Sequence, residues 1–335
     1  MKGIKLPKDA QRRLPFYLAL EEWVAGHLPD GDYFFAWQVK PSVICGRHQV
    51  MCREIDLDYC RRAGIAVWRR KSGGGCVFSD NNNVMFSYVT RRDGVQTSFD
   101  RYTTAVIGML ASLGLKAERS GRNDIEIGGR KVAGNAFYAV PGHSIVHGTM
   151  LYDADPATMA KVLTPSRAKL SGKGVKSVPA RISTLRANGL SMSCREFVDH
   201  AVRCMCTDGF YELTASDIRE VEEIERSYLS PEFYNDRPDR AGSGRRIEGV
   251  GEIRCRISLS DADAGEIESM ALSGDFFALS DVNSALCDRL VGTRADRTSL
   301  AETLRDIDTA AVIDGLTKEQ LIDLILHDHE NNMPS

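Results

Sequence analysis

The chain has 335 residues, of which 43% are hydrophobic and 27% are charged, and its formal net charge is −3 at pH 7. This composition is ordinary for a globular protein, and the near-neutral balance excludes the global basic field that attracts nucleic acid. No apolar run approaches the roughly 20 residues that span a bilayer, and the first 16 residues lack the apolar core of a signal peptide. We therefore expect a cytoplasmic protein of about two domains, with neither nucleic acid nor membrane as a partner.

Helices and strands alternate in the first third of the chain. Apolar residues that recur at helical spacing mark the helices, and short β-branched and aromatic runs mark the strands. In chain order we expect a helix over 9–28, strands over 33–39 and 42–47, a helix over 56–63 that ends at Gly64, strands over 65–70, 76–78 and 84–90, and a helix over 97–113.

A tight β-hairpin is predicted next. Its strands cover 125–127 and 130–134, and the Gly128-Gly129 pair between them supplies the positive φ that two-residue turns require. Another strand follows over 145–152, and short helices are expected from 156 to 227.

The polar segment 235–245, NDRPDRAGSGR, contains proline and glycine and is predicted to be a linker. Beyond it we expect strands over 246–259 and 266–272, then helices near 281–291, 298–307 and 317–327. The predicted fold class is α+β, with a large mixed-sheet domain over 1–234 and a small α/β domain over 246–335.

The nine cysteines form no CxxC pair, and Cys204-Met205-Cys206 has no second cluster to complete a metal shell. Reduced thiols in a cytosolic protein are the expected state.

The segment 69–78, RRKSGGGCVF, is the most unusual stretch of the chain. Three consecutive glycines favour a place where the main chain approaches a ligand, and the exposed amides with the neighbouring arginine suit a phosphate. A flexible hairpin turn is the alternative. The P-loop pattern is absent from the chain.

Lys131 stands among the small residues Val132, Ala133 and Gly134. It is either an exposed edge charge or a cation that neutralises a phosphate. Regular alternation would place Lys131 and Ala133 on one face of the strand, and Val132 and Gly134 on the other. His147 on the next strand is either a structural residue or directed at the same place.

Together these segments resemble the lipoate–protein ligase A family, in its two-domain form, of the biotin/lipoyl ligase superfamily. Order and spacing agree over about residues 16–186, and the strands-then-helices pattern after 246 resembles the family's accessory C-terminal domain. The segments that carry the resemblance are 43–49, 69–78, Gly-Arg-Asn-Asp at 121–124, Arg-Lys-Val-Ala-Gly at 130–134, His-Gly-Thr at 147–149, 173–178 and 181–183.

The resemblance implies a site for ATP and the acyl-adenylate. Lys131 is the implied catalytic residue, and Asp124 is the implied Mg²⁺ ligand. The implied binding residues are Arg70, Ser72, Gly73, Gly74, Gly75, Cys76, Val77, Phe78, Asn123, Asp124, Lys131, Ala133, Gly134, His147, Gly148, Thr149, Lys173 and Val175.

The implied activity is the ATP- and Mg²⁺-dependent adenylation of lipoate or octanoate. The acyl group then passes to a lysine of a lipoyl domain of a 2-oxoacid dehydrogenase or of the glycine-cleavage H protein.

Three other functions are weighed against this one. An ATP-independent lipoyl or octanoyl transferase of the same fold needs a cysteine beyond Lys131, and residues 132–193 contain none. A biotin–protein ligase would carry a Gly-Arg-Gly-Arg loop, which is missing. A non-enzymatic acyl-adenylate carrier would have less need of Arg70, Asp124 and Lys131.

Overall fold

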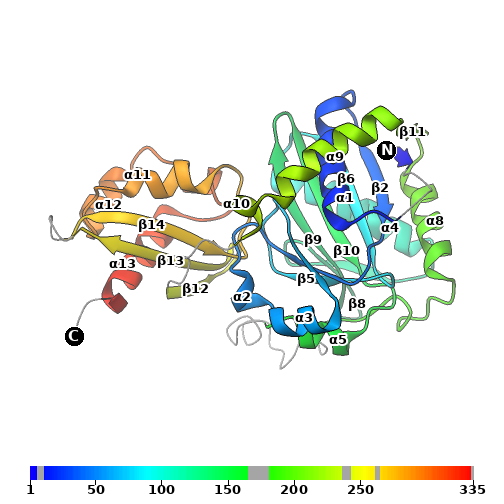
Figure 1. Cartoon of the computed structure of the whole chain (residues 1–335), viewed down its shortest axis with the longest axis horizontal. Coiled ribbons are helices and arrows are strands. Elements are labelled where there is room, and N and C mark those ends of the chain that lie inside the picture. The colour runs from blue at the N-terminus through cyan, green and yellow to red at the C-terminus, as the bar shows by residue number, and fades with distance from the viewer. Residues whose placement is uncertain (6–10, 165–180, 236–242, 261–264, 333–335) are drawn as a thin grey trace. The chain divides into compact units, whose positions relative to one another are not determined.

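A computed structural model describes residues 1–5, 11–164, 181–235, 243–260 and 265–332 (Figure 1). The chain divides into two compact units, which are described separately. The first comprises Met1–Cys45, Cys52–Lys71 and Cys76–Tyr234, and the second comprises Gly46–Met51, Ser72–Gly75 and Asn235–Ser335. Two short segments of the second unit therefore come from the range 1–234 that the sequence assigned to one domain. In the described part of the chain, no helix has the length and apolar character needed to cross a bilayer.

The first unit is built on an eight-stranded sheet. Its strands, in spatial order, are β11 (Phe210–Glu212), β1 (Lys2–Lys5), β2 (Tyr33–Trp37), β6 (Val84–Arg91), β10 (His143–Met150), β9 (Arg130–Val140), β8 (Asp124–Ile127) and β7 (Ala117–Ser120). The β11–β1 and β1–β2 pairs are parallel and the other pairs are antiparallel. The predicted α+β class with a large mixed sheet is confirmed.

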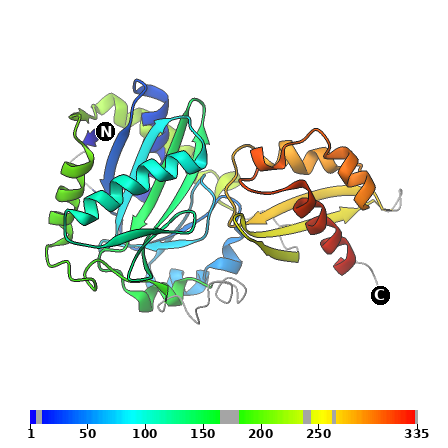
Figure 2. The same ribbon diagram turned by 180° about the vertical axis from the view of Figure 1, so that it is seen from behind.

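Helices cover both faces of this sheet, because the central strands are apolar on both sides. On one face α4 (Val95–Ala111) and α8 (Cys194–Met205) bring Phe99 against Phe137 and Phe197 against Phe86. The other face packs against α1 (Leu14–His27), whose Tyr17 stacks on Trp37. A second long helix on this face, α9 (Ala215–Leu229), packs along α1. Figure 1 is drawn from the α1 and α9 side, and Figure 2 shows α4 across the opposite face.

A second, smaller sheet lies on the α1 side of the large sheet. It is formed by β4 (Ala66–Arg69), β3 (Ser42–Cys45) and β5 (Val77–Ser79), in that order. Trp68 and Val77 from this sheet pack into the same apolar cluster as Trp37 and Met85 from the large one. The short helices of the unit are α2 (Met51–Glu54), α3 (Leu57–Ala63), α5 (Pro156–Val162) and α10 (Pro231–Tyr234). The predicted stop of α3 at Gly64 is confirmed by its left-handed φ of 65°.

The second unit has a three-stranded antiparallel sheet covered by helices. Its elements are β12 (Ser243–Ile247), β13 (Gly251–Leu259), β14 (Ile267–Gly274), η1 (Asn283–Cys287), α11 (Asp288–Leu290), α12 (Arg297–Thr303), η2 (Thr309–Ala311) and α13 (Lys318–Asn332). The single strand expected over 246–259 is wrong. A turn with Gly249 at a φ of 76° divides it, and the first strand begins at Ser243, inside the expected linker.

Candidate functional site

The β8–β9 hairpin carries the central residues of the candidate site. Its turn is confirmed, since Gly128 and Gly129 have φ values of 56° and 72°. The expected alternation after the turn is wrong, however. Glu126 pairs with Lys131 while Ile125 pairs with Ala133, so a β-bulge at Val132 interrupts the register. Lys131 therefore shares a face with Gly134, and a Cβ atom at position 134 would overlap the ammonium of Lys131.

Asp124 lies between two cations at the start of β8. Lys131 Nζ is 2.7 Å from its Oδ1 atom, and Arg181 Nη2 is 2.5 Å from its Oδ2 atom. Only 9% of the Asp124 side chain is exposed, against 21% for Lys131 and 25% for Arg181. Charge-assisted hydrogen bonds in a partly buried position fix the orientation of all three groups.

Arg181 is a site residue that the sequence did not single out. Its backbone is held beside β9, because Ser183 N donates to Lys131 O at 2.8 Å and Ile182 forms a parallel bridge with Lys131. The signal was present in the segment 181–183, which carried the family resemblance but to which no role was given.

Asn123, another predicted site residue, is braced by Asn135. Asn123 Nδ2 donates to Asn135 O at 2.6 Å, and Asn135 donates to Asn123 O from Nδ2 at 2.9 Å and from its backbone N at 3.0 Å. Gly148 makes this arrangement possible, since a Cβ atom there would overlap Asn135 Oδ1. Gly148 thus leaves space for a side chain of the protein itself, and Asn135 is a second residue that the sequence missed.

His147 belongs to a buried polar network under the site. Its Nδ1 atom lies 2.8 Å and 3.0 Å from the two carboxylate oxygens of Glu21 on α1. Glu21 also accepts hydrogen bonds from Ser87 Oγ at 2.6 Å and from Tyr138 Oη at 3.3 Å. Burial raises the pKa of Tyr138 well above its usual value, and Tyr228 and Glu21 add to the effect, so the hydroxyl stays protonated as a donor.

A cross-strand row connects the cations to the apolar cluster. Thr149 pairs with Gly134 on one side and with Met85 on the other, and Met85 pairs with Trp37. Thr149 Oγ1 also contacts Met85 Sδ at 3.1 Å. The inner face of the sheet thus changes from charged at Lys131 to apolar at Trp37. Such a surface suits a ligand with a phosphate at one end and a hydrocarbon chain at the other.

Arg70 and the strand after the glycines are held by the smaller sheet. Arg70 is buried, its N atom donates to Cys45 O at 3.0 Å, and its Nη1 atom donates to Ile44 O at 3.1 Å. Val77 and Phe78 pair with Ile44 and Val43 of β3. Cys76, half-buried, directly precedes this strand.

The glycine run itself lies in the second unit. Gly74 N donates to Phe276 O at 3.3 Å, and a Cβ atom at Gly73 would overlap that same carbonyl oxygen. Gly74 has a φ of 84°. The sequence predicted that the glycines let the main chain approach a ligand. At Gly73, the group that approaches is instead the backbone carbonyl of Phe276.

Two of the predicted binding residues have no described position. Lys173 and Val175 lie outside the described residues. The described part of the chain contains no group of three or more His, Cys, Asp or Glu side chains that could hold a metal ion. Both Asp124 oxygens face cations, so a Mg²⁺ ion at this carboxylate would need most of its ligands from phosphate oxygens and water, as Mg²⁺ commonly has.

Comparison with known proteins assigns the chain to a family. Residues 14–205 match the family model of the lipoyl protein ligase A/B catalytic domain, and residues 243–325 match that of the bacterial lipoate protein ligase C-terminus. The lipoate-protein ligase LplJ of Bacillus subtilis is 33% identical over 319 residues, which cover 92% of this chain and 95% of that protein.

Two solved structures resemble a large part of this chain. One comes from an archaeal lipoylation system, described as a bi-partite lipoate protein ligase and its E2 lipoyl domain from Thermoplasma acidophilum. It has a TM-score of 0.61 and 26% identity, and the match covers 70% of this chain and 96% of that one. The other, a lipoate-protein ligase A bound with ATP, has a TM-score of 0.60 and 25% identity over 70% of this chain and 98% of that one.

The fold and the matched regions define a ligase of the lipoyl-transferring class. This chain belongs to the lipoate–protein ligase family, in the form that has both the catalytic and the C-terminal domain. The resemblance predicted from the sequence is confirmed, and so is the enzyme class, a ligase that attaches lipoate to protein.

Proposed function

We propose that the protein uses ATP to convert lipoate, or octanoate, to the acyl-adenylate and then transfers the acyl group to a lysine of an acceptor protein. One observation carries this proposal: Lys131 and Arg181 converge on Asp124 at the charged end of a row that continues into an apolar cluster. The ATP complex of a related ligase supports the choice of nucleotide.

In the first half-reaction, a carboxylate oxygen of lipoate attacks the α-phosphorus of ATP and pyrophosphate leaves. Negative charge increases on the phosphate oxygens, and cations aimed at them lower the barrier. Asp124 holds Lys131 and Arg181 in a defined geometry before substrate arrives, so little reorganisation is needed on binding. We assign Lys131 as the catalytic residue and Asn123, Asp124, Gly134 and Thr149 as its surroundings.

In the second half-reaction, the neutral lysine amine of the acceptor attacks the acyl carbon, AMP leaves with the electrons of the acyl–phosphate bond, and the proton lost by the amine passes to solvent. The same ammonium, Lys131, stabilises charge on the carbonyl and phosphate oxygens. No covalent enzyme intermediate is required.

Mg²⁺ is expected to enter with the nucleotide, where it would neutralise charge on the phosphates. Asp124 is the described carboxylate that fits a ligand role, alongside phosphate oxygens and water. We assign residues 1–234 to the adenylate-forming part, except Gly46–Met51 and Ser72–Gly75, which group with the second unit, 235–242 to the linker and 243–335 to the accessory part.

The proposed acceptors are lipoyl domains of 2-oxoacid dehydrogenase complexes and the glycine-cleavage H protein. The E2 lipoyl domain studied with the Thermoplasma ligase supports the first of these.

The decisive experiment is to incubate the protein with ATP, Mg²⁺ and lipoate without acceptor, and to look for lipoyl-AMP by mass spectrometry and for pyrophosphate exchange. We expect both with lipoate, and neither with biotin. If exchange stays at background with lipoate and octanoate while acyl groups pass from a thioester donor to a lipoyl domain, the protein is instead an ATP-independent transferase.

A further inference from the structure

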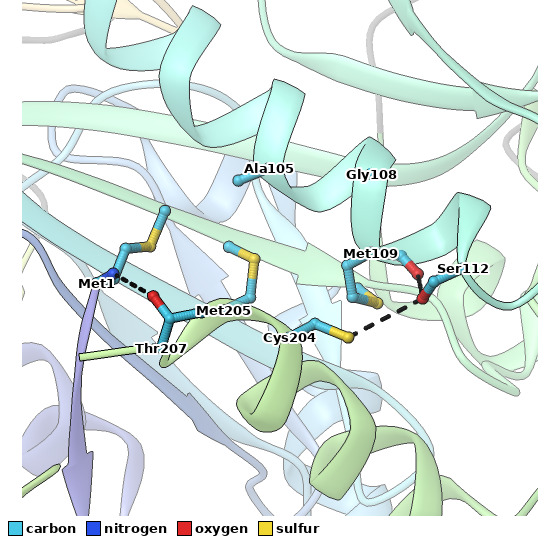
Figure 3. A pocket seen from close by; sticks show the side chains of 8 residues that line it. All are labelled: Met1, Ala105, Gly108, Met109, Ser112, Cys204, Met205 and Thr207. Atoms are coloured by element: carbon cyan, nitrogen blue, oxygen red, sulfur yellow. Dashed lines mark hydrogen bonds between the residues drawn. The ribbon is translucent and has the colours of Figure 1, made fainter. Parts of the chain in front are cut away.

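A cavity on the opposite face of the large sheet from Lys131 is lined by several sulfur-containing side chains. It lies between α4, α8 and the N-terminal strand and has a volume of about 440 Å³. Its lining comprises Met1, Ala105, Gly108, Met109, Ser112, Cys204, Met205 and Thr207 (Figure 3). Four of these eight residues contain sulfur, and none is acidic.

His200 stands beside the cavity, one helical turn before Cys204 on α8, so both side chains lie on one face of the helix. Its Nε2 atom is 3.3 Å from Cys204 Sγ and 2.8 Å from Ser112 Oγ of the facing helix α4. Cys204 and Ser112 are exposed and His200 is half-buried, so solutes reach the Cys204 thiol directly.

The spacing of the pair matches that of two ligands on one metal ion. With a metal–sulfur distance of about 2.3 Å, a metal–nitrogen distance of about 2.0–2.1 Å and a tetrahedral angle, the two ligand atoms are about 3.5 Å apart. The observed 3.3 Å requires a change of a few tenths of an ångström. The neighbouring thioether of Met109 is a soft donor that lines the same cavity.

We propose that Cys204 and His200, with the thioether of Met109, bind a soft monovalent d¹⁰ metal ion of the Cu⁺ type. Thiolate, thioether and imidazole are the ligands that such ions prefer. A single thiolate balances the charge of a monovalent ion. A divalent ion would find too few ligands, because no group of three His, Cys, Asp or Glu side chains exists among the described residues. On binding, the Cys204 thiol loses its proton to solvent, and the neutral imidazole of His200 carries its hydrogen on Nδ1, so that Nε2 is open to the metal.

Ser112 separates this proposal from a merely hydrogen-bonded thiol. Its hydroxyl is hydrogen-bonded to Nε2 of His200, the same atom that would bind the metal. Removal of the hydroxyl should therefore leave metal affinity unchanged or raise it, whereas a Ser–His–Cys hydrogen-bond chain would be weakened.

The test is an anaerobic titration of the reduced full-length chain with Cu⁺ in competition with the chromophoric chelator bicinchoninate. We expect one tightly held ion per chain. Cys204→Ser and His200→Gln should each lower the affinity at least about tenfold, and Met109→Leu should lower it less. Ser112→Ala should not weaken binding, and Cys52→Ser, which removes another exposed thiol, should have no effect.

Melting curves of each variant control for folding, which the exposed Cys52, Ser112 and Cys204 should barely affect, whereas Met109 is buried and needs this control most. Equal competition by the wild type and Cys204→Ser would overturn the proposal, as would an equal loss in Cys52→Ser. An unchanged affinity in His200→Gln would also overturn the proposal, because the metal would then be bound by the Cys204 thiol without the imidazole. None of these outcomes depends on ligase activity.

Discussion

The ammonium of Lys131 lies over Gly134, in the space that a Cβ atom at position 134 would fill. The β-bulge at Val132 creates this relationship by turning both residues to the same face of β9. Small displacements of a catalytic group have large effects on rate, about hundredfold for 1 Å.

The first prediction therefore concerns Gly134→Ala. The φ of Gly134 is not in the left-handed region, so alanine is compatible with the backbone, and the flexible end of Lys131 can move aside. We expect adenylation to fall about tenfold to hundredfold with a change in unfolding free energy of no more than about 1 kcal/mol. Pyrophosphate exchange and urea unfolding measure the two effects. A rate close to that of the wild type would show that the position of the ammonium above Gly134 is not required.

Lys131→Ala should remove both half-reactions while the protein folds normally. The side chain is polar and partly exposed, so it contributes little to the core, whereas loss of a preorganised charge costs about 10²–10³ in rate. Lys131→Arg should fail as well, because a planar guanidinium does not fit the space above Gly134. Lipoyl-AMP formation and transfer from supplied lipoyl-AMP are measured separately, with a melting curve as control. Near-normal rates in both assays would contradict the catalytic assignment and leave Lys131 as a partly exposed charge at the edge of the strand.

The sequence predicted those parts of this site that depend on local chemistry. The Gly128-Gly129 turn and the stop at Gly64 follow from the φ values that glycine alone adopts readily. The bulge at Val132 was not predictable in the same way, because it arises from pairing between strands. The consequence was that Gly134 was placed on the wrong face.

Residues that join the site from distant segments were also missed. Arg181 reaches Asp124 across 57 positions of sequence. Glu21 sits on α1 next to Glu22, where two adjacent carboxylates are typical of a solvated helix face, and only the fold reveals that Glu21 is fully buried against His147. In the second unit, Gly249 marked a turn that the apolar residues around it obscured.

Asp124→Asn tests how the two cations are held. The amide keeps the size of the side chain but removes the negative charge from between Lys131 and Arg181. We expect adenylation to fall at least about tenfold, as when an orienting partner of a functional group is lost. The Mg²⁺ concentration that gives half-maximal rate should also rise if this carboxylate contacts the metal. A lower rate with an unchanged Mg²⁺ dependence would assign Asp124 to positioning of the cations alone.

Cys76→Ala should leave transfer within about tenfold of the wild-type rate. Cys76 is the thiol that precedes the predicted binding strand, and the chemistry proposed here needs no thiol nucleophile. A loss beyond about hundredfold, equivalent to about 2.7 kcal/mol of activation free energy, would favour covalent catalysis. Alkylation of the wild type, with Cys76→Ala treated in parallel, provides a second measurement of the same point.

Glu21→Ala should affect stability much more than any substitution above. The carboxylate is fully buried and accepts hydrogen bonds from Ser87 and Tyr138 while it faces His147. Its removal would leave several buried polar groups without a partner, which costs about 3–5 kcal/mol in comparable buried networks. Glu223→Ala on α9 is the matched control, because that carboxylate is 65% exposed in a surface pair with Arg226 and should change the free energy of unfolding by no more than about 0.5 kcal/mol. Urea unfolding of both variants measures the difference. If the two carboxylates proved equally dispensable, the Glu21–His147 contact would not stabilise the fold beneath the site.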